Sequence, residues 1–243
     1  MGIEGLNIDE INSKVAQYWS VSVTEETRST QLDLRANFNP GQVLIAEFQS
    51  AGRGRLDRKF EVPAGKGLLF SFTLKIDREF GWIPLITGLA VAQAINEYFN
   101  KELVFLKWPN DLLIGEDKLG GILCEQVGDE LVIGVGINIF QSKSELPTLT
   151  ATSLSMHGQV DRTQLMILIL NSIGGAFSKM DIKAELDELK QLYQERCVTL
   201  GKKIAAILPN GESIEDVAIG ISNDGSLLLK SREITVADIV HLR

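Results

Sequence analysis

The 243-residue chain has few of the residues that carry the commonest catalytic and metal-binding chemistry. It holds two cysteines, Cys124 and Cys197, and two histidines, His157 and His241. Two cysteines in a chain of this length build no disulfide framework and fit a reducing compartment, so we expect a cytoplasmic protein. No Cys/His cluster has the spacing of a zinc site. Neither histidine has a Ser or Cys partner pattern, which argues against a histidine-based triad.

The sequence also lacks an apolar run of membrane-spanning length, and its polar, acidic start does not resemble a signal peptide. Its formal net charge is -8, which argues against a general binder of nucleic acid or of membrane surfaces. We therefore expect no DNA partner and no membrane partner. A local anion site remains compatible with this charge, and the 44% of hydrophobic residues is enough to form a core.

Against this acidic background, the stretch "QSAGRGRLDRKF", residues 49–60, concentrates positive charge on flexible backbone. Four cations, Arg53, Arg55, Arg58 and Lys59, surround two glycines. Glycine lets the backbone approach a ligand closely, and arginine offers a planar fork of donors that matches phosphate or carboxylate. The stretch is therefore either an anion cradle or a solvated surface loop, and these residues alone do not decide between the two.

A second unusual stretch is "KWPNDLLIGEDKLGGIL", residues 107–123. Lys118 precedes two adjacent glycines in a predicted strand, where glycine indicates close approach of a ligand or of another backbone. A turn rich in small residues is the alternative. Chemistry built from Arg, Lys, Gly and amide groups points to electrostatic stabilisation of phosphoryl or acyl-phosphate species without a covalent nucleophile.

The pattern of apolar residues predicts an α+β fold. Helical spacing is found over residues 8–19, 82–99, 161–180 and 182–196, and a short helix is possible over residues 30–38. Strand-like runs occupy residues 21–27, 42–49 and 67–76, and a meander follows residue 110. After residue 199 the chain consists of short alternating strands with turns. We predict a catalytic domain over residues 1–199 and a small β domain over residues 200–243.

Taken together in this order, "ETRSTQ", "AEFQSAGRGR", "KWPNDL", "KLGGIL" and "GVGIN" resemble the biotin protein ligases. The resemblance covers residues 21–243 and implies a mixed-sheet catalytic domain of the biotin/lipoate ligase type, followed by a small SH3-like β-barrel. It implies an ATP-dependent ligase that forms biotinyl-5′-AMP with Mg²⁺. The ligase then transfers biotin to one lysine of a biotin carboxyl carrier protein. About two dozen residues precede the first motif, too few for the DNA-binding domain of some relatives, so we expect a short form.

The resemblance also implies roles for the matched residues. Arg55 and Lys118 are the expected catalytic residues, because they would meet the phosphate at which the reaction occurs. The expected biotin-binding residues are Ser29, Thr30, Gln31, Gln49, Gly52, Arg53, Gly54, Arg55, Lys118, Gly121, Leu123, Gly134 and Gly136. The expected nucleotide-binding residues are Arg53, Arg55, Lys118, Asn110, Asp111 and Asn138. The metal ligands, the residue that stacks on adenine and the oligomeric state, with a homodimer as one option, stay open.

Three positions depart from the family pattern: Gln31 replaces the usual Asn, Asp57 a glycine and Phe60 a tryptophan. Two other functions remain alternatives. A lipoate ligase would share the fold and the acyl-adenylate chemistry. A non-catalytic module that senses biotin or nucleotide would have lost its activity through Asp57.

Overall fold

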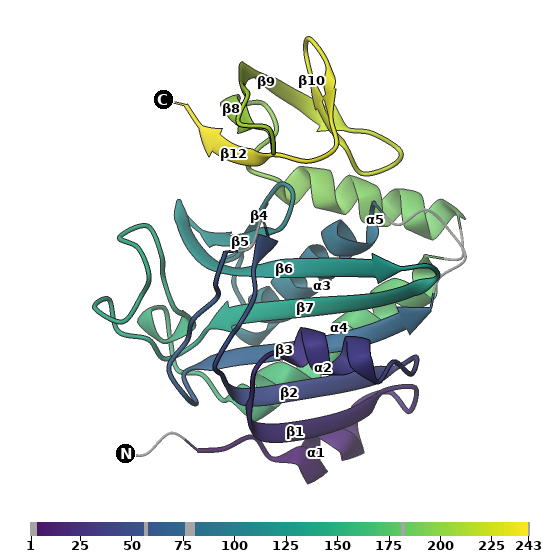
Figure 1. Cartoon of the computed structure of the whole chain (residues 1–243), viewed down its shortest axis with the longest axis vertical. Helices are drawn as coiled ribbons and strands as arrows, with labels where there is room; N and C mark the ends of the chain where they lie inside the picture. Colours follow the sequence, from purple (N-terminus) through teal and green to yellow (C-terminus); the bar gives the residue numbers. More distant parts are fainter. Residues whose placement is uncertain (1–3, 56–57, 76–80, 181–182, 243) are drawn as a thin grey trace.

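The computed structural model describes residues 4–55, 58–75, 81–180 and 183–242. Its larger part is a seven-stranded sheet with the order β1-β2-β3-β7-β6-β5-β4 (Figure 1). These strands are β1 (Ser20–Thr27), β2 (Gln42–Gln49), β3 (Gly67–Lys75), β4 (Phe105–Lys107), β5 (Asp111–Ile114), β6 (Asp117–Val127) and β7 (Glu130–Asn138). The β1–β2 pair is parallel and the other pairs are antiparallel, so the sheet is mixed, as expected.

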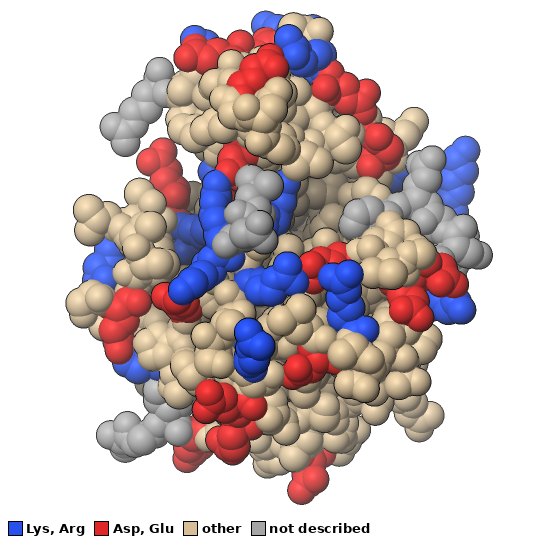
Figure 2. Space-filling view, viewed as in Figure 1, with Lys and Arg blue, Asp and Glu red and all other residues tan. Residues whose placement is uncertain are grey.

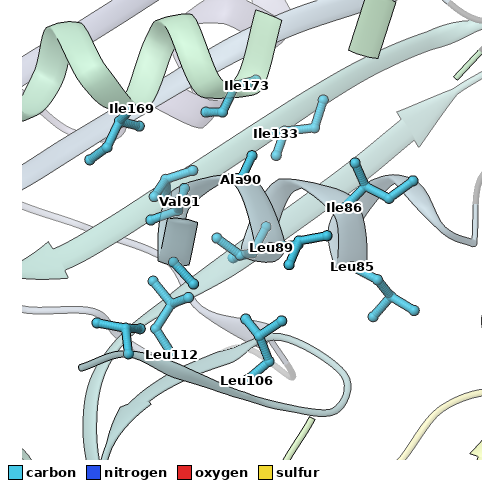
Figure 3. Close-up of a cluster of buried hydrophobic side chains, with 14 of the residues drawn as sticks. Leu85, Ile86, Leu89, Ala90, Val91, Leu106, Leu112, Ile133, Ile169 and Ile173 are labelled. Atoms are coloured by element: carbon cyan, nitrogen blue, oxygen red, sulfur yellow. The ribbon is translucent and has the colours of Figure 1, made fainter. Parts of the chain in front are cut away.

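Helices cover both faces of this sheet (Figure 1). The nearly wholly apolar α3 (Ile83–Tyr98) lies against one face, together with α4 (Arg162–Lys179). Leu89 and Val91 of α3 lie in a cluster with Ile133 of β7 and Ile169 of α4 (Figure 3). The short α2 (Thr30–Ala36) lies on the other face. Because α3 packs against the sheet, α4 and α5, most of its residues are buried.

Helix ends follow the sequence signals closely at two positions. Asn7 caps α1 (Ile8–Lys14) by accepting a hydrogen bond from Glu10 N–H, and Asp161 caps α4 through Gln164 N–H. The predicted helix over residues 8–19 is too long, because α1 ends at Lys14. Trp19 instead donates its indole N–H to Leu170 O. Trp19 is therefore apolar because it packs in the core, and its position four residues after Val15 does not mean that the helix continues.

The C-terminal part of the chain is a second sheet that lies beyond α5 (Lys183–Arg196) (Figure 1). Its strands are β8 (Lys203–Ile207), β9 (Ser213–Ile221), β10 (Leu227–Leu229), β11 (Glu233–Ile234) and β12 (Asp238–His241). They pair antiparallel in the order β11-β10-β9-β8-β12, which fits a small SH3-like domain. Pairing among the described strands leaves β11 and β12 at the two edges, so no closed barrel is formed by these pairs.

Two buried tryptophans join the C-terminal sheet to the rest of the molecule. Trp82 donates its indole N–H to Ser222 O, and Trp108 donates to Gly225 O, each at 3.0 Å. Gly225 also lies so close to Gly81 that a Cβ on it would come within 2.6 Å of Gly81 O. The C-terminal sheet is therefore fixed in position beside the end of β4. Among the described residues, none of the helices is long and apolar enough to cross a membrane.

Candidate active site

A cavity of about 330 Å³ opens between the large sheet and the C-terminal sheet. Its lining comes from the start of α2, the Gly/Arg loop after β2, the strands β3, β6 and β7, and the strand β12. Figure 2 shows Lys and Arg side chains gathered around a hollow in the middle of this face. The acidic protein therefore concentrates cations at one concave place, which favours the anion cradle over the solvated surface loop.

A buried polar cluster forms one part of the wall. It consists of Ser29, Thr30 and Gln31 around the start of α2, with Gln49 and Ser71 beside them. The backbone N–H of Thr30 donates to Gln49 Oε1 at 2.8 Å, and Gln31 Nε2 donates to Val132 O at 2.7 Å. Ser29 is 1% exposed, and its Oγ has no hydrogen-bond partner in the described structure. A buried hydroxyl left unpaired costs free energy, so Ser29 is prepared to bind a polar ligand group.

Three glycines on paired strands line the cavity between the polar cluster and the cations. Gly134 and Gly136 lie on β7, and Gly121 lies on β6 opposite Gly136. A Cβ on Gly134 would come within 2.7 Å of Gln31 Oε1, and a Cβ on Gly136 within 2.5 Å of the Phe60 ring. The missing side chains thus leave room for the Gln31 amide and the Phe60 ring.

The Gly/Arg loop folds back on itself as a short antiparallel bridge between Arg53 and Lys59. Gly54 N–H donates to Arg58 O at 2.7 Å, and Phe60 N–H donates to Gly52 O at 2.9 Å. The ring of Phe60 reaches the glycines of β7, which is consistent with the expectation that phenylalanine fills an apolar gap there. Asp57, whose effect on the loop was an open question, lies outside the described residues.

The three arginines of this loop have different partners. Arg53 Nη1 contacts both carboxylate oxygens of Glu125, at 3.0 and 3.2 Å. Arg58 forms an ion pair with Asp238 of the C-terminal sheet. Arg55 Nη1 donates to Asn110 Oδ1 at 3.3 Å and has no ion-pair partner among the described residues. Arg55 is therefore the loop arginine whose charge is most available to a ligand.

Two lysines extend the positive wall beside Arg55. Lys118 Nζ lies 2.5 Å from Asp111 Oδ1, and Lys107 lines the same cavity. Burial lowers the pKa of Lys107, and the nearby Asp111 carboxylate opposes this effect. Burial likewise lowers the pKa of Arg55, with Asp238 and Asp111 opposing it. Both cations lose hydration through burial, so an anionic ligand would stabilise both groups.

Most residues predicted for the site lie together in the cavity wall. These are Ser29, Thr30, Gln31, Gln49, Arg53, Gly54, Arg55, Asn110, Asp111, Lys118, Gly121, Leu123, Gly134 and Gly136. Gly52 and Asn138 are not part of the wall. A Cβ on Gly52 would lie 2.2 Å from Phe60 O, which explains its glycine by the fold of the loop. Asn138 donates to Thr152 O and accepts from Gln141, so its amide supports the chain after β7.

Several cavity residues were not predicted. Lys107 is the first residue of "KWPND", so its motif was recognised but its side chain was given no role. Ser71 lies within a run that predicts only a strand, and nothing in the local sequence marks its hydroxyl as part of a site. Ile207 and residues 238–240 come from the C-terminal sheet, which the motifs do not reach. Neither histidine is among the residues that line the cavity.

The described residues include no group of three or more His, Cys, Asp and Glu side chains that could hold a metal ion by themselves. The cavity nonetheless contains two carboxylates, Asp111 and Asp238. One or two carboxylates suit Mg²⁺ bound together with the phosphates of a nucleotide, because this ion usually keeps several waters and is shared with the substrate.

Comparison with known proteins gives consistent results. Residues 20–139 match the family model described as "Biotin/lipoate A/B protein ligase family". The chain is 30% identical to the biotin--[acetyl-CoA-carboxylase] ligase of Mycobacterium tuberculosis, over 97% of this chain and 94% of that protein. It is 31% identical to the bifunctional ligase/repressor BirA of Bacillus subtilis, over 87% of this chain and 68% of that protein.

Solved structures lead to the same group of proteins. The biotin protein ligase from Aquifex aeolicus in complex with biotin and ATP superposes with a TM-score of 0.80. It is 30% identical in sequence, and the match covers 92% of this chain and 99% of that one. The similarity therefore extends over both sheets.

Proposed function

Because the chain belongs to the biotin/lipoate A/B protein ligase family, we propose that it is a biotin protein ligase. It activates biotin with ATP to give biotinyl-5′-AMP and pyrophosphate. It then transfers the biotinyl group to a lysine of a carboxylase carrier domain. Biotin and ATP bind side by side in the cavity described above.

The observation that carries this proposal is the combination of two unlike surfaces in one cavity. A buried polar cluster with an unpaired Ser29 hydroxyl suits the urea group of biotin, which has both donors and an acceptor. Half-buried cations beside glycine-lined backbone suit the phosphates of ATP. The valeryl chain runs along the glycine-lined wall between them, so that its carboxylate reaches the α-phosphate.

In the first step, a carboxylate oxygen of biotin attacks the α-phosphorus of ATP, and the bond from this phosphorus to the pyrophosphate oxygen breaks. Arg55 and Lys118 act as the catalytic residues by stabilising the negative charge that builds on the α-phosphate oxygens. Lys107 adds a third cation to the same wall. Asn110 keeps Arg55 in place through the hydrogen bond to its guanidinium group.

In the second step, the amine of the acceptor lysine attacks the acyl carbonyl carbon, and AMP leaves with the bonding electrons. The Gly/Arg loop covers the mixed anhydride and limits its contact with water. Arg53 and Arg58 hold this loop at Glu125 and Asp238, and Arg55 contacts the adenylate between them.

Mg²⁺ is the expected metal, bound chiefly by the phosphates of ATP. Asp111 is the candidate protein ligand, since it lies in the wall beside Lys118. The ion would neutralise phosphate charge and favour departure of pyrophosphate. Asn138, which donates to Thr152 O, stays a candidate nucleotide-binding residue.

We also propose how the chain divides into domains and in which compartment the protein works. Residues 1–199 form the catalytic domain, and residues 200–243 form a β domain that completes the cavity wall.

The two free thiols, Cys124 and Cys197, and the need for ATP favour the cytoplasm. Burial raises the pKa of both thiols, which disfavours the reactive thiolate.

The test is turnover by the pure protein. Incubation with biotin, ATP and Mg²⁺ should release pyrophosphate, and addition of a carrier domain should give a covalent biotinyl-lysine detected by mass spectrometry. Lipoate in place of biotin is the control for the alternative acyl substrate, because its dithiolane ring has no strong acceptor for the polar cluster. Turnover with lipoate alone, or binding of biotin without any pyrophosphate release, would contradict the proposal.

A further inference from the structure

The polar wall of the cavity contains a chain of hydrogen bonds that runs from β7 to Gln49. Ser71 Oγ lies 2.8 Å from Thr30 Oγ1 and 3.1 Å from Gln31 Oε1. Thr30 in turn contacts Gln49 Oε1 through its backbone N–H at 2.8 Å and through its hydroxyl at 3.2 Å. Ser71, Thr30 and Gln31 are at most 3% exposed, so water does not supply their partners.

Backbone groups fix the orientation of the two glutamine amides at the ends of this series of hydrogen bonds. Val132 O only accepts, so the Gln31 amide must turn its Nε2 toward Val132 and its Oε1 toward Ser71. The backbone N–H of Thr30 only donates, so the Gln49 amide must turn its Oε1 toward Thr30. Neither amide can flip without placing two donors or two acceptors against each other.

The direction of the intervening hydrogens follows from these two ends. Gln31 Oε1 only accepts, so Ser71 must donate its single hydroxyl hydrogen to it. Ser71 Oγ can then only accept from Thr30, whose hydroxyl hydrogen is used at 2.8 Å and not at the longer 3.2 Å contact with Gln49. Gln49 lines the cavity and its Nε2 has no partner among the described residues, so its N–H donors are available to a ligand.

We propose that Ser71 is a positioning residue that fixes the donor and acceptor pattern of the polar wall. This inference rests on the proposed function, because the pattern then determines which head group the site accepts. Gln49 Nε2 and the Ser29 hydroxyl can donate hydrogen bonds to an acceptor atom of the ligand. Thr30 Oγ1, whose hydrogen is donated to Ser71, keeps lone pairs that accept from ligand N–H groups. A cyclic urea, with one carbonyl oxygen and two N–H groups, matches this pattern, and a dithiolane does not.

The experiment measures binding of biotin by calorimetry in the absence of ATP, and the Michaelis constant for ATP separately. Ser71→Ala should weaken biotin binding about tenfold, because Thr30 and Gln31 lose the partner that fixes the direction of their polar groups toward the ligand. The Michaelis constant for ATP should stay within about twofold of the wild-type value, since no cation contacts Ser71. Ser71→Thr keeps the hydroxyl and should restore most of the affinity.

Thr73→Val is the matched control. Thr73 lies two residues along β3 and is also fully buried, but its hydroxyl donates to Asn39 O outside the cavity. It should lower stability without changing biotin affinity. The inference is overturned if Ser71→Ala binds biotin as tightly as the wild type. It is also overturned if Thr73→Val weakens biotin binding as much as Ser71→Ala does.

A second measurement needs no variant. The guanidino analogue of biotin replaces the urea oxygen with a protonated nitrogen, so it presents a donor where the wall also presents donors. The wild-type protein should bind biotin on the order of 100-fold more tightly than this analogue, because the mismatch leaves buried donors unpaired. Equal affinity would refute the assigned pattern. If the wild-type protein binds no biotin at all, the proposed function itself is wrong.

Discussion

At the scale of single residues, the site depends on partly buried cations. Their desolvation costs free energy that binding of a phosphate would offset. Lys107 illustrates this point, because burial lowers its pKa while Asp111 opposes that effect. A poorly hydrated positive charge interacts strongly with a polyanion. We therefore expect Lys107 to contribute to ligand binding more than to stability.

Replacing Lys107 tests this reasoning. Lys107→Met should reduce kcat/KM for ATP by about 10²-fold, in line with the loss of one preorganised charge contact. The melting temperature of the ligand-free protein should not fall, because the substitution removes a desolvated charge. Steady-state pyrophosphate release and a thermal melt measure the two effects. Lys75→Met, at an exposed ion pair with Asp129, is the control and should leave turnover unchanged.

At the scale of elements, the Gly/Arg loop is held at two places by carboxylates from different parts of the chain. Arg53 pairs with Glu125 on β6, and Arg58 pairs with Asp238 on β12. The side chain of Arg53 is 34% exposed and that of Glu125 is 20% exposed, so this pair is partly shielded from water. The loop therefore has a preferred position before any ligand binds, with Arg55 between the two attachments.

Loss of one attachment should loosen the loop. Glu125→Gln removes the charge that holds Arg53 and should raise the rate of tryptic cleavage within residues 53–59 severalfold. Biotin together with ATP should still slow this cleavage, because the loop also contacts the adenylate. Limited proteolysis followed by mass spectrometry locates the cuts. Asp129→Asn breaks an exposed ion pair elsewhere and should not alter the rate at the loop. Equal cleavage of the wild type and Glu125→Gln would show that Glu125 does not hold the loop.

At the scale of the whole molecule, the cavity is complete only when the C-terminal sheet is in place. Asp238, Ile239 and Ile207 belong to that sheet and line the cavity, and Arg58 reaches across to it. The sheet is held by the indoles of Trp82 and Trp108 and by the close approach of Gly225 to Gly81. Stability and substrate binding should therefore change together when this junction is disturbed.

Two glycines of the C-terminal sheet allow this to be measured. Gly225 has φ +88° and Gly211 has φ +85°, so alanine at either position costs about 1 kcal/mol of backbone strain. A Cβ at Gly225 would also lie 2.6 Å from Gly81 O, whereas a Cβ at Gly211 meets no atom within 4 Å. Gly225→Ala should therefore destabilise by roughly 2 kcal/mol more than Gly211→Ala, as overpacked contacts do. Denaturant unfolding measures the difference in the free energy of unfolding. Equal losses for the two variants would show that the Gly225–Gly81 contact relaxes at no cost.

The sequence by itself determined the chemistry of this protein and the local conformation of many of its parts. Glycines between arginines and a lysine before paired glycines pointed to an anion site, and the family resemblance of the motifs implied an acyl-adenylate; the chain belongs to the corresponding family. Asn7 and Asp161 cap α1 and α4, and such a cap depends on residues within one turn. Such features are local, so neighbouring residues are enough to specify them.

Only the tertiary structure decided which side chains share the cavity and what each one contacts. Arg53 and Arg55 look alike in the sequence, but Arg53 pairs with Glu125, 72 residues away, and Arg55 stays available. Ser71 became part of the polar wall because β3 lies between β2 and β7, and Asp238 reached the loop from the last strand. These contacts join residues that are distant along the chain. They depend on strand order and on the position of one sheet against another, which no local pattern specifies.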